Sequence, residues 1–133
     1  MSRLVLDTSA FSHFRRGDSR IAALVDSAEW IGMPAIVLGE LRAGFSQGRM
    51  ARQNEEALRA FLSHPVVEIL AVDDEVSGIY ADIFAALRRA GSSIPTNDIW
   101  IAATAARAGA TVLTFDEHFR LIARVGAWIL ERA

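Results

Sequence analysis

Two residue types are missing from this chain of 133 residues: cysteine and lysine. Without cysteine, the chain has no disulfide, no thiolate metal ligand and no cysteine nucleophile. Without lysine, all 14 basic residues are arginines, and they face 16 acidic residues for a formal net charge of −2. A protein that holds nucleic acid by general electrostatic attraction has a basic balance instead. Any contact with nucleic acid must therefore come from a local arginine patch or from bound cations.

Long apolar runs are absent as well. No run approaches the roughly 20 residues of a membrane span, and the N-terminus lacks the layout of a signal peptide. We therefore expect a cytoplasmic protein that does not enter a membrane. Apolar residues make up 52% of the chain, which argues against disorder. The length fits one domain, residues 1–133, with a substantial core.

Short apolar runs alternate with amphipathic segments along the whole chain. The runs at 3–6, 30–33, 66–70 and 111–115 are typical of strands, and 127–130 is expected to be an edge strand. Helical patterns lie between them, the clearest from residue 73 to residue 90. This alternation predicts an α/β fold with three layers, in which helices flank a central parallel sheet of four to five strands.

The segment 95–106 is the most unusual helical pattern. Pro95 precedes Asn97 and Asp98, either of which is a suitable N-cap, and almost no polar side chain follows. Such a helix is expected to be buried. A carboxylate at the start of a buried helix needs a counter-charge, because an unpaired buried charge is costly. A metal ion is one way to supply that counter-charge at Asp98.

Three further acids lie in unusual places. Asp7 and Asp116 each follow an apolar strand directly, which is where open α/β sheets bind their ligands. Asp7 is also a suitable N-cap for the next helix, and that interpretation stays open. Glu40 lies in an apolar helical stripe, where the residues three and four positions away carry no charge. It is therefore a candidate functional residue.

Carboxylates that crowd together repel one another and resist ionisation, and a hard divalent cation removes that problem. Mg²⁺ or Mn²⁺ takes oxygen ligands and often keeps several waters. An all-oxygen site of this kind suits the hydrolysis of a phosphodiester, because the metal activates water and offsets the charge on phosphate. The sequence therefore predicts a metal-dependent hydrolase, provided that the fold brings these acids together.

Four motifs together resemble a known family. They are Leu4-Val5-Leu6-Asp7-Thr8-Ser9, Leu38-Gly39-Glu40-Leu41, Asn97-Asp98-Ile99-Trp100-Ile101-Ala102-Ala103 and Leu113-Thr114-Phe115-Asp116-Glu117-His118-Phe119. In order and spacing, the chain resembles a PIN-domain ribonuclease of the VapC toxin type, from bacterial or archaeal toxin–antitoxin pairs. Each motif alone has little specificity, but the set covers essentially the whole chain.

The resemblance implies a PIN-like fold and a site for Mg²⁺ or Mn²⁺ built from Asp7, Glu40, Asp98 and Asp116. It also implies that the hydroxyls of Thr8 or Ser9 and of Thr114 orient carboxylates or waters. Asp116 corresponds to the family's most variable acid. The family resemblance further implies a homodimer, a small VapB-type antitoxin that covers the site, and structured RNA such as tRNA or ribosomal RNA as substrate.

Several basic residues are candidates for supporting roles. Arginines that follow the strand ends or the Glu40 helix are suited to binding RNA phosphates: Arg15, Arg16, Arg42, Arg49 and Arg52. His118, two residues after Asp116, has the chemistry of a metal ligand or a proton donor. We expect it to be a packing or capping histidine.

Other classes fit less well. A phosphatase of the haloacid-dehalogenase type needs a second aspartate two residues after the first, where this chain has Ser9. A receiver domain needs a lysine, and P-loop and dinucleotide motifs are absent. Two alternatives remain within the PIN family: an RNA-processing nuclease without an antitoxin, and an inactive PIN-like module that only binds a partner.

Overall fold

One parallel sheet forms the centre of the protein. The structure is a computed structural model that describes residues 2–132. The sheet has five strands in the order β3-β2-β1-β4-β5, and every neighbouring pair is parallel. The strands are β1 Arg3–Leu6, β2 Trp30–Pro34, β3 Val67–Leu70, β4 Thr111–Thr114 and β5 Ala127–Ile129.

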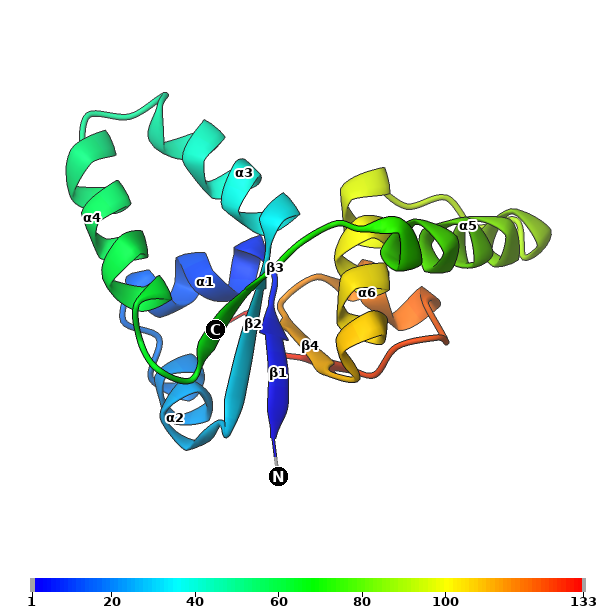
Figure 1. Cartoon of the computed structure of the whole chain (residues 1–133), viewed down its shortest axis with the longest axis horizontal. Coiled ribbons are helices and arrows are strands. Elements are labelled where there is room, and N and C mark those ends of the chain that lie inside the picture. The colour runs from blue at the N-terminus through cyan, green and yellow to red at the C-terminus, as the bar shows by residue number, and fades with distance from the viewer. Residues whose placement is uncertain (1, 133) are drawn as a thin grey trace.

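Helices cover both faces of this sheet, which confirms the expected three-layer α/β/α architecture (Figure 1). In Figure 1, α1, α2 and α4 lie on one side of the strands, and α5 and α6 lie on the other. The helices are α1 Thr8–Arg15, α2 Ser19–Ser27, α3 Ala35–Phe45, α4 Ala51–Leu62, α5 Asp74–Arg89 and α6 Thr96–Ala108, with a short 3₁₀ helix, η1, at Glu117–Leu121. In residues 2–132, no helix has the length and apolarity needed to cross a membrane.

The central strand β1 sets the position of the first acid. Leu4, Val5 and Leu6 are buried, as expected for a strand with neighbours on both edges and helices on both faces. Leu6 is paired with Leu113 of β4, and the backbone N–H of Asp7 donates to the carbonyl of Leu113 at 3.3 Å. The segments that follow β1 and β4 therefore begin side by side at one edge of the sheet.

Helix α3 follows β2 without an intervening loop. We expected Pro34 in the first turn of the helix, but it is the last residue of β2 and the N-cap of α3. Its extended backbone, with ψ of 141°, can continue the strand and still present its carbonyl to the helix. Glu40 thus lies in the second turn of a helix that leaves the same sheet edge as Asp7.

Helix α6 is the buried helix predicted from its sequence. Its buried side chains are mostly small or aliphatic: Ile99, Ile101, Ala102, Ala103, Thr104 and Ala105. Small residues allow α6 to pack closely on β2, β4 and α5. The predicted N-cap was wrong, because Pro95 takes that position and its carbonyl accepts from the N–H groups of Asp98 and Ile99. The side chain of Asp98 makes no capping bond and remains available for other contacts.

Candidate active site

Asp7 is the most buried of the candidate acids, with 4% of its surface exposed. It caps α1, because Oδ1 accepts from the backbone N–H of Ala10 at 2.8 Å. Oδ1 also accepts from the Ser9 hydroxyl at 2.8 Å, and Oδ2 accepts from the Thr114 hydroxyl at 2.5 Å. Burial raises the pKa of Asp7, these hydrogen bonds oppose that rise, and the nearby charge of Asp116 adds to it. Capping and a place in the acidic cluster are thus compatible at this residue.

Asp116 directly follows Phe115, the residue after β4, and starts η1. Its Oδ1 accepts from the backbone N–H of His118 at 2.9 Å, which fixes the turn that carries the His118 side chain. The backbone N–H of Asp116 donates to the Thr114 hydroxyl at 2.8 Å. The Thr114 hydroxyl therefore contacts both the backbone of Asp116 and the carboxylate of Asp7.

Asp98 faces these two acids from the first turn of α6. Its side chain is 15% exposed. The pKa of Asp98 is raised to about 6, chiefly by burial and next by the charge of Asp116, with a smaller contribution from Asp7. Contact with His118 opposes the rise. Asp7, Asp98 and Asp116 are therefore close enough for their charges to repel one another. The strand-end pattern predicted that Asp7 and Asp116 are neighbours.

Glu40 lies at the rim of this cluster. Its Oε1 accepts from the Thr8 hydroxyl at 2.5 Å, and its Oε2 accepts from the side-chain amide of Asn97 at 3.2 Å. Thr8 and Asn97 are the immediate neighbours of Asp7 and Asp98 in sequence. Glu40 is therefore tied to both segments, although its carboxylate is not in the tight group formed by the side chains of Asp98, Asp116 and His118.

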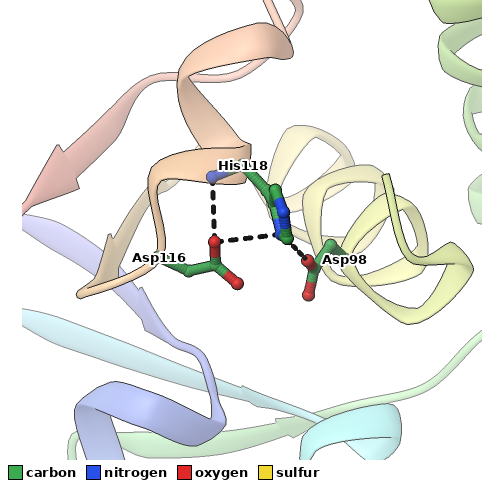
Figure 2. A group of neighbouring side chains, drawn as sticks. All are labelled: Asp98, Asp116 and His118. Atoms are coloured by element: carbon green, nitrogen blue, oxygen red, sulfur yellow. Dashed lines mark hydrogen bonds and ion pairs between the residues drawn. The ribbon is translucent and has the colours of Figure 1, made fainter. Parts of the chain in front are cut away.

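The ring of His118 lies between two carboxylates (Figure 2). Its Nδ1 is 3.2 Å from Oδ2 of Asp98 and 3.0 Å from Oδ1 of Asp116. The His118 side chain is 46% exposed, so the expectation that it packs or caps was wrong. Its position two residues after Asp116 was the available sequence signal, because a tight 3₁₀ turn returns the ring to the acids. Asn97 was also missed as a contact of Glu40.

The five arginines considered for RNA binding differ in their surroundings. Arg42 contacts both Oε atoms of Glu55, at 3.0 and 3.3 Å from its Nε, so that α3 and α4 are linked. The other four are exposed and form no ion pair within residues 2–132: Arg15 and Arg16 at the end of α1, and Arg49 and Arg52 around the start of α4. Of the five, these four can meet an external phosphate without breaking an ion pair.

The donor set at this edge of the sheet fits a divalent cation. Oxygens of Asp98 and Asp116 and a nitrogen of His118 all lie within 4.8 Å of one another. Among the residues described, no arginine pairs with Asp7, Glu40, Asp98 or Asp116. The pKa values of Asp7 and Asp98 are raised mainly by burial, and the charge of Asp116 adds to the rise at both residues. A metal ion would compensate the negative charge of the cluster, whereas residues 2–132 supply only one basic side chain there, that of His118.

A parallel α/β/α fold with carboxylates gathered beyond the ends of β1 and β4 defines a class of candidate metal-dependent hydrolases. Comparisons with known proteins narrow this class. The model of the PIN domain family matches residues 4–125. Ribonuclease VapC4 of Mycobacterium tuberculosis is 36% identical over 91 residues, which are 68% of this chain and 69% of that protein. The chain therefore belongs to the PIN domain family.

Two further relatives span more of the chain. Ribonuclease VapC5 of Mycobacterium tuberculosis is 31% identical over 115 residues, covering 86% of this chain and 84% of the relative. The crystal structure of VapBC2 from Rickettsia felis, bound to a DNA fragment from the promoter, aligns with a TM-score of 0.83 and 26% identity. That alignment covers 97% of this chain and 99% of the Rickettsia chain, so the similarity extends over nearly the whole fold.

Proposed function

We propose that this protein is a metal-dependent endoribonuclease and the toxin of a toxin–antitoxin pair. It hydrolyses phosphodiester bonds in structured RNA such as tRNA or ribosomal RNA. The observation that carries the proposal is the set of carboxylates beyond β1 and β4, whose charge no arginine of residues 2–132 compensates. Relatives that are named ribonucleases, at 36% and 31% identity, support the same activity.

Mg²⁺ or Mn²⁺ is the proposed cofactor, held by Asp7, Asp98 and Asp116, with Glu40 at the rim. When bound, such an ion activates water and offsets charge on the phosphate and the leaving oxygen. Both ions accept the oxygen-rich donor set found here. The four acids are proposed to be the catalytic residues.

The hydroxyl groups around the acids have a positioning role in this proposal. Ser9 and Thr114 donate to the two oxygens of Asp7 and so keep its carboxylate in one orientation. Thr8 holds one oxygen of Glu40 in the same way. A carboxylate with fixed orientation does not have to be ordered when metal or RNA binds, which favours both events.

We propose that RNA phosphates bind to the four candidate arginines that form no ion pair. Arg15, Arg16, Arg49 and Arg52 are exposed, and each can neutralise a phosphate and release its counterions. Arg42 was a candidate on sequence grounds, but its bond to Glu55 makes it a link between two helices. Because the net charge of the chain is −2, general electrostatic attraction would not hold RNA, and local arginines are needed to bind it.

The proposed assembly is a homodimer controlled by a VapB-type antitoxin, with residues 1–133 as a single PIN domain. VapBC complexes such as that of Rickettsia felis, with a TM-score of 0.83, support an antitoxin partner. Because tRNA and ribosomal RNA lie in the cytoplasm, we expect the protein to act there. Light scattering at micromolar concentration tests the dimer, and relief of toxicity by a neighbouring gene product tests the antitoxin.

The test of the activity is cleavage of total tRNA and ribosomal RNA by antitoxin-free protein with Mg²⁺ or Mn²⁺. We expect discrete cuts that disappear with EDTA and in Asp98→Asn. Asp74→Asn is the matched control, because Asp74 is an exposed aspartate in the first turn of another helix, and it should cut like the unmodified protein. Tight partner binding without metal-dependent cleavage would favour an inactive PIN-like module. Cleavage without toxicity would favour an RNA-processing nuclease.

A further inference from the structure

We propose that His118 is itself a metal ligand, through Nδ1, and that this nitrogen biases the site toward transition-metal ions over Mg²⁺. The proposal rests on the metal site of the proposed function and adds a fifth residue to it. It concerns the choice of ion, which the four carboxylates alone do not decide, since oxygen ligands suit Mg²⁺ and Mn²⁺ alike.

Distances around the ring carry the argument. Nδ1 lies 3.2 Å from Oδ2 of Asp98 and 3.0 Å from Oδ1 of Asp116. Neighbouring ligands of an octahedral ion, each about 2.1 Å from the metal, are about 3.0 Å apart. Nδ1 is therefore already spaced from each of the two oxygens like an adjacent ligand of the same ion, and all three atoms lie within 4.8 Å of one another.

The backbone holds the ring in this position. The N–H of His118 donates to the same oxygen of Asp116 that faces its Nδ1, so the 3₁₀ turn and the carboxylate fix each other. Within residues 2–132, the only polar partners of the His118 ring are the two carboxylates. A ring that served only packing would not leave 46% of its side chain exposed. As a ligand, it would carry its proton on Nε2 and present the Nδ1 lone pair to the ion.

A nitrogen ligand has a predictable effect on ion choice. Mg²⁺ prefers oxygen ligands and retains its waters, so it gains little from an imidazole. The affinity of a site with nitrogen rises along the series from Mn²⁺ to Co²⁺ and beyond. Removing the nitrogen should therefore weaken Co²⁺ binding most, Mn²⁺ binding less and Mg²⁺ binding least.

The same distances also fit a different role. A protonated His118 can pair with Asp98 and Asp116 and so act as a cation that competes with the metal. This alternative makes the opposite prediction, because removing a competing cation strengthens the binding of every divalent ion. The direction of the change in affinity therefore separates the two roles.

The experiment is calorimetric titration of the RNA-free protein with Mg²⁺, Mn²⁺ or Co²⁺ alone. We expect His118→Ala to raise the Kd for Co²⁺ about tenfold or more and the Kd for Mg²⁺ by no more than about twofold. His118→Asn should give the same order of losses, because its amide can keep the hydrogen bonds to the acids without supplying a ring nitrogen. His64→Ala is the matched control, since His64 is exposed and lies just before β3, away from the acids.

Pulsed electron paramagnetic resonance of the Mn²⁺-loaded protein gives a direct readout. A directly bound imidazole couples its ¹⁴N nucleus to the manganese spin, and we expect that coupling in the unmodified protein and in His64→Ala. It should disappear in both His118 variants. Circular dichroism of each variant confirms that the fold is retained before the metal is added.

Three calorimetric results would overturn the proposal: Kd values that do not change, Kd values that fall, or an equal rise in Kd for all three ions. Absence of the nitrogen coupling would do the same. None of these measurements uses RNA, so the outcome is separate from that of the nuclease. A protein that binds metal through His118 but cuts no RNA would keep this inference and lose the proposed activity.

Discussion

Thr114 and Asp7 are 107 positions apart in sequence, and the hydroxyl of Thr114 donates to Oδ2 of Asp7 at 2.5 Å. Both residues are buried, Thr114 completely. The same hydroxyl accepts from the backbone N–H of Asp116. One side chain of β4 thus connects the two acids that leave the sheet at neighbouring strand ends.

Replacing that hydroxyl should damage the site without changing the shape of the residue. In Thr114→Val, the carboxylate of Asp7 loses a donor and the N–H of Asp116 loses its acceptor. We expect a loss of about 1–3 kcal/mol in the free energy of unfolding and a fall in RNA cleavage of roughly tenfold or more. Urea unfolding and cleavage assays measure the two effects. Thr111→Val, on the same strand, is the control, and equal losses in both variants would contradict a specific role for Thr114.

The raised pKa of Asp98 should make the metal-free protein less stable as the pH rises. The folded protein holds this proton with a pKa of about 6, against an ordinary value of 3.8, mainly because of burial and next because of Asp116. Since the folded state binds the proton more tightly than the unfolded state, Asp98 favours folding at low pH. This contribution is complete below about pH 4 and is lost as the pH rises through about 6.

Asp98→Asn removes this titration. In EDTA at pH 7, we expect the variant to be more stable than the unmodified protein by on the order of 1–3 kcal/mol, with the difference shrinking toward pH 4. Urea unfolding across this pH range measures it, and Asp74→Asn serves as the control. Identical pH dependence in Asp98→Asn and the unmodified protein would show that the surroundings of Asp98 do not disfavour its charge.

Glu40 and Asn97 should act as a unit. The amide of Asn97 donates to Oε2 of Glu40, so either Asn97→Ala or Glu40→Gln alters the same hydrogen bond. We expect Asn97→Ala to reduce RNA cleavage several-fold and Glu40→Gln to reduce it more. Expressed as free energies, the loss of cleavage in the double variant should be smaller than the sum of the losses in the two single variants, because substitutions of interacting residues do not have additive effects. Full additivity in this double-mutant cycle would mean that the hydrogen bond is irrelevant to activity.

RNA affinity should depend on the free arginines and not on Arg42. In an inactive Asp98→Asn background, replacing both Arg15 and Arg16 with glutamate should weaken RNA binding. The log–log slope of affinity against salt should also become shallower, by up to about one unit for each arginine that no longer binds a phosphate. Arg42→Ala should have little effect, because its guanidinium already binds Glu55. Filter binding at several salt concentrations measures both, and equal weakening by Arg42→Ala would contradict this assignment.

Replacing either of two glycines with alanine should change the free energy of unfolding, but in opposite directions. A Cβ at Gly32 of β2 would lie 2.5 Å from the Trp30 ring and 2.6 Å from a methyl of Leu70. Gly32→Ala should therefore lower the free energy of unfolding by about 1–3 kcal/mol. A Cβ at Gly78 of α5 would meet no atom within 4 Å beyond its chain neighbours and the backbone of its own helix, so Gly78→Ala should add about 0.5–1 kcal/mol to the free energy of unfolding through helix propensity. Thermal and urea unfolding compare them. Destabilisation by Gly78→Ala would show that local space alone does not predict these effects.

Much of the fold was predictable because hydrophobic periodicity is a local signal. The continuous apolar run of β1 and the buried pattern of α6 indicated the layer order, and the acid after each central strand indicated the edge that carries the site. The start of α6 was misassigned, because the sequence rule favours a side-chain cap whereas Pro95 serves through its backbone carbonyl. That difference leaves the Asp98 carboxylate free for the cluster.

Contacts between distant segments were not predictable in the same way. The pairing of Arg42 with Glu55 depends on how α3 and α4 turn back on each other, and no local pattern encodes that angle. The ring of His118 reaches Asp98 only because η1 is a tight 3₁₀ turn beside the first turn of α6. Sequence patterns and the family resemblance therefore indicated the acids and the hydroxyls beside them, but only the three-dimensional fold identified the contacts of Arg42 and His118.

The order of the sheet has a consequence for synthesis of the protein. Strand β4 pairs with β1 at the centre of the sheet, and Asp116, the last of the four candidate acids, follows β4. A nascent chain that carries only Asp7, Glu40 and Asp98 lacks both the fourth carboxylate and the Thr114 hydroxyl that orients the first. For the proposed nuclease, the four carboxylates and the Thr114 hydroxyl are therefore all present only after Asp116 has been translated, and a shorter nascent chain lacks the complete site.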